Sequence, residues 1–550
     1  MGGAGGCSVR LGALASCAFL LLGAPGAALA AGVALLPHTT LNVGPGQVVN
    51  GGVGPGPLGY AFGVLVTNAG MINGDVDLRG SGSPFGNSAN SFVAEPGGVL
   101  NGNLILGIGG DLFETALANP GPGQYAGVTG TVTSNLADVL WYRVAADAST
   151  SLATPTPFGT VIFDVSSGAK LTINGGNPQL RSVQFLGTGS VDITADRTSV
   201  DMGTNLDVRA PITLVSRGTL TQVHASTVFG AQSSVLIGPQ TDFTNAGTIV
   251  EQDLAPNLPA CSPLLVCPPH VGAVFGSGIV TNTGVISLQS ADGVLNGFGG
   301  SLTVSNSGVI QELAGPSGSR GIVNANTVVN TGTISVGGVG VLLGGQASLT
   351  NAGLITSASD TAVDTNPSSG LVTIVNQSGG SISGAVYGVR VTGGGSVVSA
   401  GLIAGGVDSV IFTSQGLNSL TLQTGAGLVG DAVGNPASFN ALVLQGAGSA
   451  GVDFLNFTSL TMQGPGIWAL NGGSSIPTTE VAGGTLQVGD AGHAAATLTS
   501  AITVDPGATL SGHGTVVGAV TNNGAVLPGG SIGVLTIQGA YVQAAVAVPP

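Results

Sequence analysis

The motif Asn-x-Gly-x-Ile recurs along the chain about every two dozen residues, and no other feature of the sequence limits the fold as strongly. The steps between the residues that open successive copies are 37, 24, 24, 21 and 25 residues. These copies begin at Asn245, Asn282, Asn306, Asn330, Asn351 and, in a weaker form, Asn376, with an outlying copy at Asn68 and a variant without Asn at Ser399. Self-similarity at such a period indicates a solenoid, in which each repeat buries its apolar face only against its neighbours.

The residues within each repeat indicate β-strands. They form short alternating runs of Val, Ile, Leu and Thr that Gly and Asn interrupt, as in "GIVTNTGVISLQ" from residue 278. The repeat region offers no apolar stripe of helical period with capping residues, so repeats that contain helices fit poorly. We predict an all-β chain folded as a right-handed parallel β-helix (β-solenoid), with roughly twenty turns over residues 31–475. An array of small β-sandwich domains would need linkers, and we find none.

Each motif residue has an expected role in such a coil. Gly is expected to adopt the positive φ that a tight corner needs. Asn residues of successive turns are expected to stack as a ladder of side-chain amides. Ile is expected to point inward and to stack on the Ile residues above and below.

The composition is that of a folded chain, and the first thirty residues resemble an export signal. Gly accounts for 97 of the 550 residues, yet 43% of the residues are hydrophobic, whereas disordered Gly-rich chains are poor in Val, Ile and Leu. Residues 1–30 read as a signal peptide, with Arg10, an apolar run and cleavage between Ala30 and Ala31. "LASC" at 14–17 resembles a lipoprotein box, but Cys17 lies inside the apolar run instead of after it.

The charge balance argues against polyanionic partners. The chain has 10 Lys plus Arg and 25 Asp plus Glu, and loss of Arg10 with the signal peptide would leave 10 − 1 = 9 cations. Such an acidic chain has no electrostatic route to nucleic acid or to anionic lipid. Beyond the signal, no apolar run approaches the ~18–20 residues of a transmembrane helix.

The 37-residue step contains an insertion. Residues 253–270 hold five prolines together with Cys261 and Cys267, and proline cannot donate to a sheet ladder. We predict a loop extruded from one turn and closed by a disulfide between the two cysteines. A metal site is the alternative interpretation, but only His270 lies nearby as a third ligand.

Residues 111–157, with Trp141 and Tyr142, are less periodic, and we interpret them as ordinary turns instead of a second loop.

The last hundred residues carry a second signature. "GPGIWALNG" (464–472), "VAGGTLQVGD" (481–490) and a Gly-rich stretch from 507 to 543 follow one another. This segment closely resembles the C-terminal autochaperone region, with its passenger-associated transport repeat, of pertactin-like autotransporter (type V secretion) passenger domains. The local apolar alternation fits a folding nucleus, for which we expect the core residues Trp468, Leu470, Leu486, Val488, Leu510 and Val516.

The resemblance implies a protein exported from a Gram-negative bacterium through an outer-membrane translocator barrel. It divides the chain into the signal peptide (1–30), passenger turns (31–460), an autochaperone-like cap (461–543) and a tail (544–550). This sequence departs from the family in one respect. A barrel needs about a dozen amphipathic strands, and the residues after Gln543 do not supply them, so we expect the partner barrel to be missing from this chain.

Catalytic signatures are weak. The nearest string to a serine-protease motif is "GNSAN" at 86–90, and neither a P-loop nor His-Glu-x-x-His occurs. Asp360 and Asp364 are the best carboxylate pair. Placed on one extended segment they would lie ~13 Å apart, too far for a glycosidase, and corner residues that keep the coil soluble are the simpler reading. The five histidines are scattered, and His513 belongs to the autochaperone segment.

These observations favour binding over catalysis. We expect a secreted or surface-exposed passenger that acts as an adhesin or in host interaction, with a host-surface or matrix ligand and a role in virulence. We expect no enzyme activity, no cofactor, no metal and a monomeric state. The alternatives are a degenerate or truncated passenger without a present function and a carbohydrate-active β-helix enzyme. Without its barrel the chain would remain periplasmic.

Overall fold

The computed structural model is all-β, and the residues that it describes contain no helix. These residues are 18–21, 26, 28–29, 32–56, 62–79, 89–107, 109–117, 124–151, 158–175, 182–200, 204–208, 210–224, 233–253, 272–289, 291–297, 300–313, 318–366, 370–529 and 533–544. The chain forms two compact units, Met1–Pro268 (the N-terminal unit) and Pro269–Pro550 (the C-terminal unit). Each is a parallel β-solenoid, and the chain makes about 19 turns in all. The predicted fold class is therefore confirmed.

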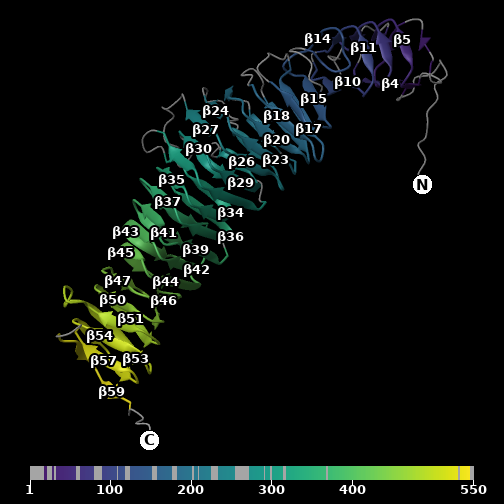
Figure 1. The fold of residues 1–550 in the computed structure, drawn as a ribbon. Coiled ribbons are helices and arrows are strands. Elements are labelled where there is room, and N and C mark those ends of the chain that lie inside the picture. The colour runs from purple at the N-terminus through teal and green to yellow at the C-terminus, as the bar shows by residue number, and fades with distance from the viewer. Residues whose placement is uncertain are drawn as a thin grey trace, which may run out of the picture. The chain divides into compact units, whose positions relative to one another are not determined.

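In the N-terminal unit, parallel strands stack into three faces (Figure 1), and the side chains between these faces are mostly apolar. The first face is β1 (Ala18–Leu21), β4 (Thr39–Val43), β7 (Leu65–Asn68), β10 (Ser91–Ala94), β13 (Leu112–Ala116), β15 (Val139–Val144), β17 (Thr160–Val165), β19 (Ser182–Gly187), β22 (Thr204–Val208) and β25 (Val235–Ile237). The second is β2 (Ala28–Leu29), β5 (Val48–Asn50), β8 (Met71–Asn73), β11 (Val99–Asn101), β16 (Ala148–Thr150), β18 (Lys170–Ile173), β20 (Ser190–Ile193), β23 (Thr213–Ser216) and β26 (Asp242–Asn245). The third is β3 (Val33–Leu35), β6 (Val53–Pro55), β9 (Val76–Asp77), β12 (Leu104–Ile105), β14 (Val132–Thr133), β21 (Arg197–Val200), β24 (Thr219–His224) and β27 (Thr248–Asp253).

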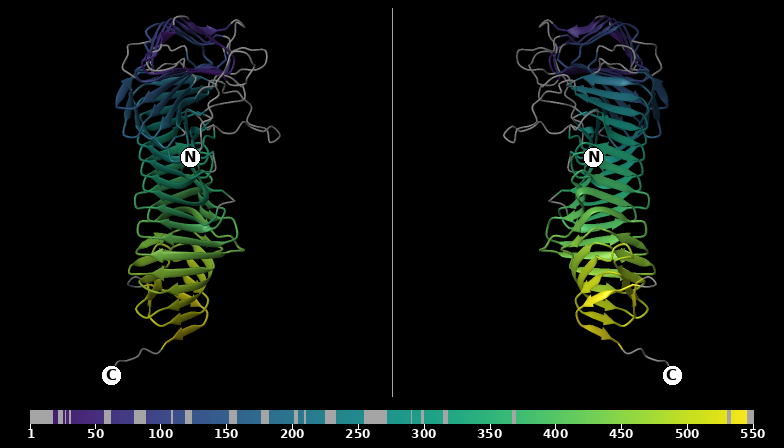
Figure 2. Two further views of the ribbon diagram at one scale, coloured as in Figure 1. Left: turned by 90° about the vertical axis from the view of Figure 1, so that its right-hand side faces the viewer. Right: turned by 90° about the vertical axis from the view of Figure 1, so that its left-hand side faces the viewer.

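The C-terminal unit repeats this arrangement, and its strands lie one above another in both views of Figure 2. Some of its strands are long enough to pass from one face to the next. They are β28 (Gly272–Gly276), β29 (Gly278–Asn282), β30 (Val285–Leu288), β31 (Asp292–Leu295), β32 (Leu302–Asn306), β33 (Val309–Glu312), β34 (Ile322–Asn330), β35 (Thr333–Val336), β36 (Val341–Asn351), β37 (Leu354–Ser357), β38 (Val363–Thr365), β39 (Val372–Asn376), β40 (Ser381–Gly384), β41 (Tyr387–Val391), β42 (Gly395–Ser399) and β43 (Leu402–Phe412). The remainder are β44 (Leu417–Leu422), β45 (Gly427–Val433), β46 (Phe439–Gln445), β47 (Gly448–Ala450), β48 (Phe454–Leu455), β49 (Ser459–Gln463), β50 (Ile467–Leu470), β51 (Gly473–Val481), β52 (Thr485–Val488), β53 (Thr497–Val504), β54 (Thr509–Gly512), β55 (Thr515–Val517), β56 (Val520–Asn522), β57 (Ala525–Pro528), β58 (Thr536–Gln538) and β59 (Tyr541–Gln543).

The Asn residues of the motif form the predicted amide ladder in the C-terminal unit. Each side-chain Nδ2 donates to the Oδ1 of the Asn one turn further on. The distances are 2.7 Å for Asn282 to Asn306, 2.8 Å for Asn306 to Asn330, 2.8 Å for Asn330 to Asn351 and 2.9 Å for Asn351 to Asn376. The motif Ile residues also lie in register and fully buried, as predicted, so the motif is one corner followed by the first inward residue of a strand.

The expected role of the motif glycine was wrong. Gly308, Gly332 and Gly353 do not adopt a positive φ. They lie instead against the backbone of the preceding turn, where a Cβ on Gly332 would stand 2.1 Å from the carbonyl oxygen of Gly308. Glycine is needed here because two turns approach each other too closely for any side chain.

The less periodic stretch from 111 to 157 consists of ordinary turns where the structure describes it. Trp141 and Tyr142 lie in β15, which pairs in register with β13 and β17. The Tyr142 ring stacks on Phe163 with centroids 5.4 Å apart, and Phe163 stacks on Phe185 at 5.8 Å. Bulky aromatic side chains thus fill successive turns, which explains the weaker Gly and Asn periodicity.

Several sequence predictions concern residues that the structure does not describe. Cys261, Cys267 and most of the expected 253–270 loop lie outside the described residues, as do Ala30 and Ala31 at the expected signal cleavage site. Within the expected signal peptide the structure places β1, which pairs in register with β4. The disulfide and the cleavage site stay predictions.

Candidate functional site

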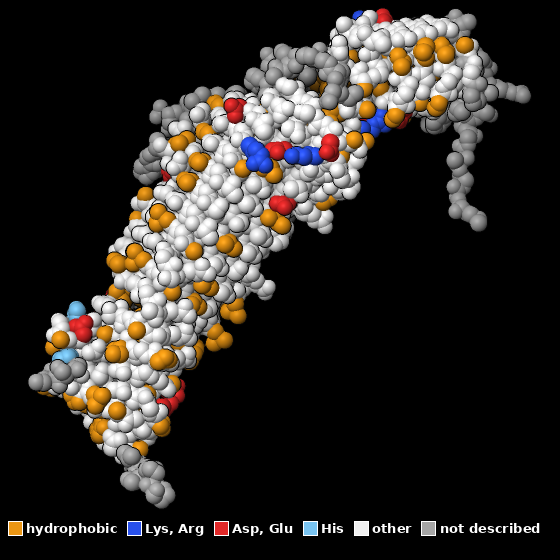
Figure 3. Space-filling model, viewed as in Figure 1, with side chains coloured by type: hydrophobic (Ala, Val, Ile, Leu, Met, Phe, Trp, Pro, Cys, Tyr) orange, Lys and Arg blue, Asp and Glu red, His pale blue; other side chains and the backbone are white. Residues whose placement is uncertain are grey.

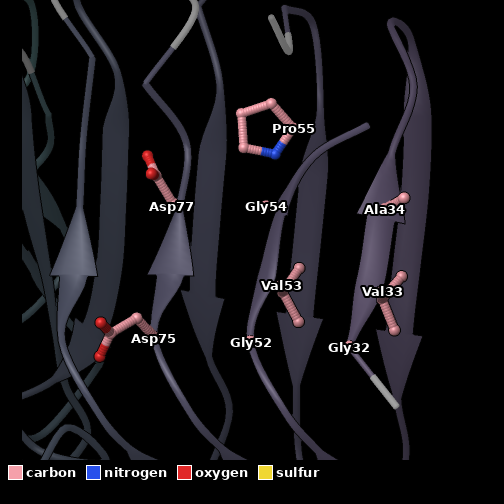
Figure 4. A pocket seen from close by; sticks show the side chains of 9 residues that line it. All are labelled: Gly32, Val33, Ala34, Gly52, Val53, Gly54, Pro55, Asp75 and Asp77. Atoms are coloured by element: carbon pink, nitrogen blue, oxygen red, sulfur yellow. The ribbon is translucent and has the colours of Figure 1, made fainter. Parts of the chain in front are cut away.

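A shallow groove lies on the outer side of the third face in the N-terminal unit. It encloses about 430 Å³. Strands β3, β6 and β9 form it side by side, within a five-stranded sheet that β12 and β14 complete (Figure 4). Its lining comprises Gly32, Val33, Ala34, Gly52, Val53, Gly54, Pro55, Asp75 and Asp77. The groove runs across the strands, so a ligand in it would contact several turns.

Glycine makes the floor of this groove. Gly54 in β6 and Ala34 in β3 are register partners, and both positions face outward. Neither residue has a large side chain that would cover the backbone. A Cβ on Gly32 would lie 2.5 Å from the carbonyl oxygen of Gly52, so Gly32 admits no side chain. A Cβ on Gly54 would meet nothing closer than 3.5 Å, so larger residues there are sterically allowed.

Two carboxylates line one side of the groove. Val76 points inward and is fully buried, so Asp75 and Asp77 on either side of it face outward. Asp75 Oδ1 accepts hydrogen bonds from the backbone N–H of Asn103 at 2.8 Å and from its Nδ2 at 3.0 Å. Asp77 accepts three from Arg79, at 3.0 Å from the backbone N–H, at 3.0 Å from Nε and at 2.7 Å from Nη2. Both carboxylates are therefore fixed in place, with lone pairs left for a ligand.

The pKa of Asp77 lies below its usual value. Partial burial acts to raise it, but hydrogen bonds from the side chain and the backbone of Arg79, together with the charge of Arg79, outweigh that effect. The Asp77 carboxylate is therefore ionised at neutral pH and accepts hydrogen bonds only. The arrangement can bind hydroxyl or amide groups, and its negative charge opposes anionic ligands.

The carboxylate pair chosen from the sequence does not form a site. Asp360 lies on a bend after β37 and Asp364 lies in β38, so the expectation that they share one extended segment was wrong. Asp364 is nearly buried and forms an ion pair with Arg390, whose Nε donates to its Oδ1 at 3.0 Å. The Asp360 carboxylate accepts the N–H of Thr361 at 2.7 Å. Both carboxylates therefore have structural partners. Asp360 lies on a bend, as expected of a corner residue, whereas Asp364 lies in a strand and is nearly buried, so it is not a soluble corner residue.

A second set of aspartates stacks in the C-terminal unit. Asp408 and Asp431 are register partners on adjacent turns. Asp431 Oδ1 accepts the N–H of Asp453 at 3.0 Å, and Asp453 Oδ1 accepts the N–H of Gly473 at 2.6 Å. Burial, with a smaller contribution from the charge of Asp431, raises the pKa of Asp408. These hydrogen bonds join consecutive turns, so the column is a structural element.

The residues expected to form the C-terminal core pack together. Trp468 is fully buried, lies over Leu486 and donates from Nε1 to the carbonyl oxygen of Gln445 at 3.0 Å. Leu486 lies in turn over Leu510 in the same sheet, Leu470 lies over Val488, and Val516 pairs with Leu498 on another face. The structure thus brings five of the six into one sheet. A role in folding stays a prediction.

Charged side chains are sparse elsewhere. Most of the face drawn in Figure 3 is white or orange, and the few charged side chains lie in small groups. In the part of the chain that the structure describes, no cluster of His, Cys, Asp or Glu could hold a metal ion. The described residues also include no helix of the length and apolar character needed to cross a membrane.

Sequence reasoning missed the groove. Its glycines lie outside the Asn-x-Gly-x-Ile copies, and their common face becomes visible only when β3, β6 and β9 are in register. The string "GDVD" at 74–77 was the available signal, because alternate aspartates around a buried Val must face outward together. Comparison with protein-family models, with curated proteins and with solved structures gave no significant match.

Proposed function

We propose that this chain is an exported, surface-exposed passenger of the autotransporter type that acts by binding an uncharged, hydroxyl-rich ligand such as a host-surface glycan. The parallel β-solenoid supports this proposal. So does the resemblance of residues 461–543 to the autochaperone region of pertactin-like passengers. The fold alone does not define a function, and the binding part of the proposal therefore rests on the groove.

The single observation that carries the binding proposal is the glycine-floored groove beside Asp75 and Asp77. A bare backbone floor accepts a flat ring closely, and two fixed carboxylates accept hydrogen bonds from neighbouring hydroxyl groups. Since the acidic side repels anions, neutral sugars fit the groove better than sulfated or sialylated ones.

Hydrolysis of a glycan is the second candidate function. Residues two apart in an extended strand lie ~6.6 Å apart, which falls within the carboxylate spacing of inverting glycosidases, about 6.5–9.5 Å. A general acid needs a raised pKa, however, and Arg79 keeps the pKa of Asp77 low. The electrostatics therefore favour binding without cleavage.

A glycan array probed with the purified chain tests both candidates. Gly54→Thr is the informative variant, because it fills the groove at a position where a Cβ meets nothing closer than 3.5 Å. Wild type should bind neutral glycans, and Gly54→Thr should lose that binding by at least tenfold in Kd. Gly427→Thr, in the C-terminal unit, is the matched control and should bind like wild type.

Two outcomes contradict the proposal. Equal binding by wild type and Gly54→Thr would place the binding site elsewhere. Release of reducing sugar from the bound glycan, with loss of release in both Asp75→Asn and Asp77→Asn, would favour the hydrolase.

A further inference from the structure

Arg197, the first residue of β21, is a buried cation without a hydrogen-bond partner. Only 3% of its surface is exposed, and Nε, Nη1 and Nη2 all lack a partner. Other Lys and Arg side chains of the described residues form ion pairs. Carboxylates pair with Arg79, Arg143, Lys170, Arg217, Arg320 and Arg390.

The neighbours of Arg197 are also buried. Leu220 of β24 is its register partner and packs inside the coil. The next inward side chain of that strand is Gln222, which is fully buried and whose amide oxygen and nitrogen both lack a partner. An unpartnered guanidinium and an unpartnered amide therefore occupy adjacent turns of the same face.

A buried carboxylate on the same face, Glu251, already has hydrogen-bond partners. Gln222 of β24 pairs in register with Glu251 of β27. Glu251 therefore lies one turn beyond Gln222 and two turns away from Arg197. Glu251 Oε1 accepts the N–H of Ser234 at 3.2 Å, and the Oγ of Ser234 accepts from Asn205 Nδ2 at 2.9 Å. Glu251 thus ties the turn of β25 to that of β27.

A buried guanidinium needs a counter-charge. Burial lowers the pKa of Arg197 to about 10, so the side chain remains protonated at neutral pH. An unpaired charge inside a protein costs several kcal/mol. Water molecules can satisfy the N–H groups, but they do not balance the charge.

We infer that the N-terminal unit binds one small inorganic anion, chloride at physiological salt, between the turns of β21 and β24. The Arg197 guanidinium supplies the charge and the Gln222 side-chain N–H supplies a further donor. The anion is small because the site lies inside a coil whose turns repeat at ~4.8 Å. It is a structural ligand that stabilises these turns, and it is independent of the groove and of the proposed adhesive function.

Hydrogen exchange of the full chain, followed by mass spectrometry in sodium chloride and in sodium gluconate of equal ionic strength, tests the inference. Peptides that cover β21 and β24 should exchange more slowly in chloride. The slowing should reach about tenfold when chloride is ten times its Kd. Peptides from β50 to β54 should not respond, because stability in a solenoid is local.

Arg197→Met should abolish the chloride effect. Arg217→Met removes an exposed cation of the same unit and should keep it. Gln222→Leu retains the cation and should weaken the effect, which keeps the test decisive if Arg197→Met does not fold. Equal exchange of wild type in the two salts would overturn the inference, because it would mean that water alone solvates Arg197. A chloride effect that persists in Arg197→Met would also overturn it.

Discussion

Asn306 donates its side-chain N–H to Asn330 Oδ1 at 2.8 Å, and Asn330 donates in the same way to Asn351. Each of these amides is fully buried, and its Nδ2 also lies near backbone carbonyl oxygens. The ladder therefore satisfies polar groups inside the coil while it fixes the register of one turn on the next. Register matters because a slip of one residue would turn every inward Ile to solvent.

Asn330→Ala should destabilise the C-terminal unit by about 2–4 kcal/mol, because it leaves a buried donor on Asn306 and a buried acceptor on Asn351 without their partners. Urea unfolding measures the effect. Asn73→Ala is the matched control, since Asn73 belongs to an exposed Asn ladder where water can replace the lost bonds. It should cost less than about 1 kcal/mol, and equal losses would show that the buried ladder has no special role.

Gly332→Ala should also destabilise this unit, by about 1–3 kcal/mol, because the new methyl group would push two turns apart. Gly427 offers a control without such an approach, since its Cβ would meet only Leu402 Cδ1 at 3.5 Å. Thermal unfolding of the two variants separates the effects. If Gly427→Ala lowers Tm as much as Gly332→Ala does, close backbone approach does not explain the motif glycine.

These residues also show what the sequence could predict. The repeat predicted the strands, the Asn ladder and the Ile column, because all three follow from side-chain alternation and a fixed period. It did not predict why Gly is required, since the distance between turns is a property of the assembled coil. The inward position of Arg197 could have been predicted, because Arg197 continues the series of alternate apolar residues Val191, Ile193 and Ala195.

Trp468→Ala should lower the stability of the C-terminal turns by about 3–5 kcal/mol, because the fully buried indole packs over Leu486. Limited proteolysis of wild type should leave a resistant fragment that includes residues ~460–543, since Trp468, Leu486 and Leu510 are buried and lie over one another in one sheet. The same digestion of Trp468→Ala should lose that fragment. Early removal of the C-terminal segment from wild type would contradict a folding nucleus there.

The groove should keep its ligand over a wide pH range. The folded-state pKa of Asp77 lies below the unfolded value of about 3.9. Its contribution to stability is therefore fully present above that value and is lost as the pH falls through the folded pKa. Ligand binding should be constant from about pH 5 to 8 and should weaken only below about pH 4. Titration of binding against pH checks this, and a midpoint near pH 6 would point to a protonated carboxyl and so to acid catalysis.

Export to the cell surface is the claim on which the proposed function depends most directly. Two experiments on a bacterium that expresses the native gene test this claim. N-terminal sequencing of the isolated chain shows whether the signal peptide is removed, and proteinase treatment of intact cells shows whether the chain is exposed at the surface. We predict a mature chain that begins at Ala31 and that proteinase removes from intact cells when those cells also make a translocator barrel for it. An uncleaved chain that begins at Met1 and is digested only after cell lysis would contradict the account.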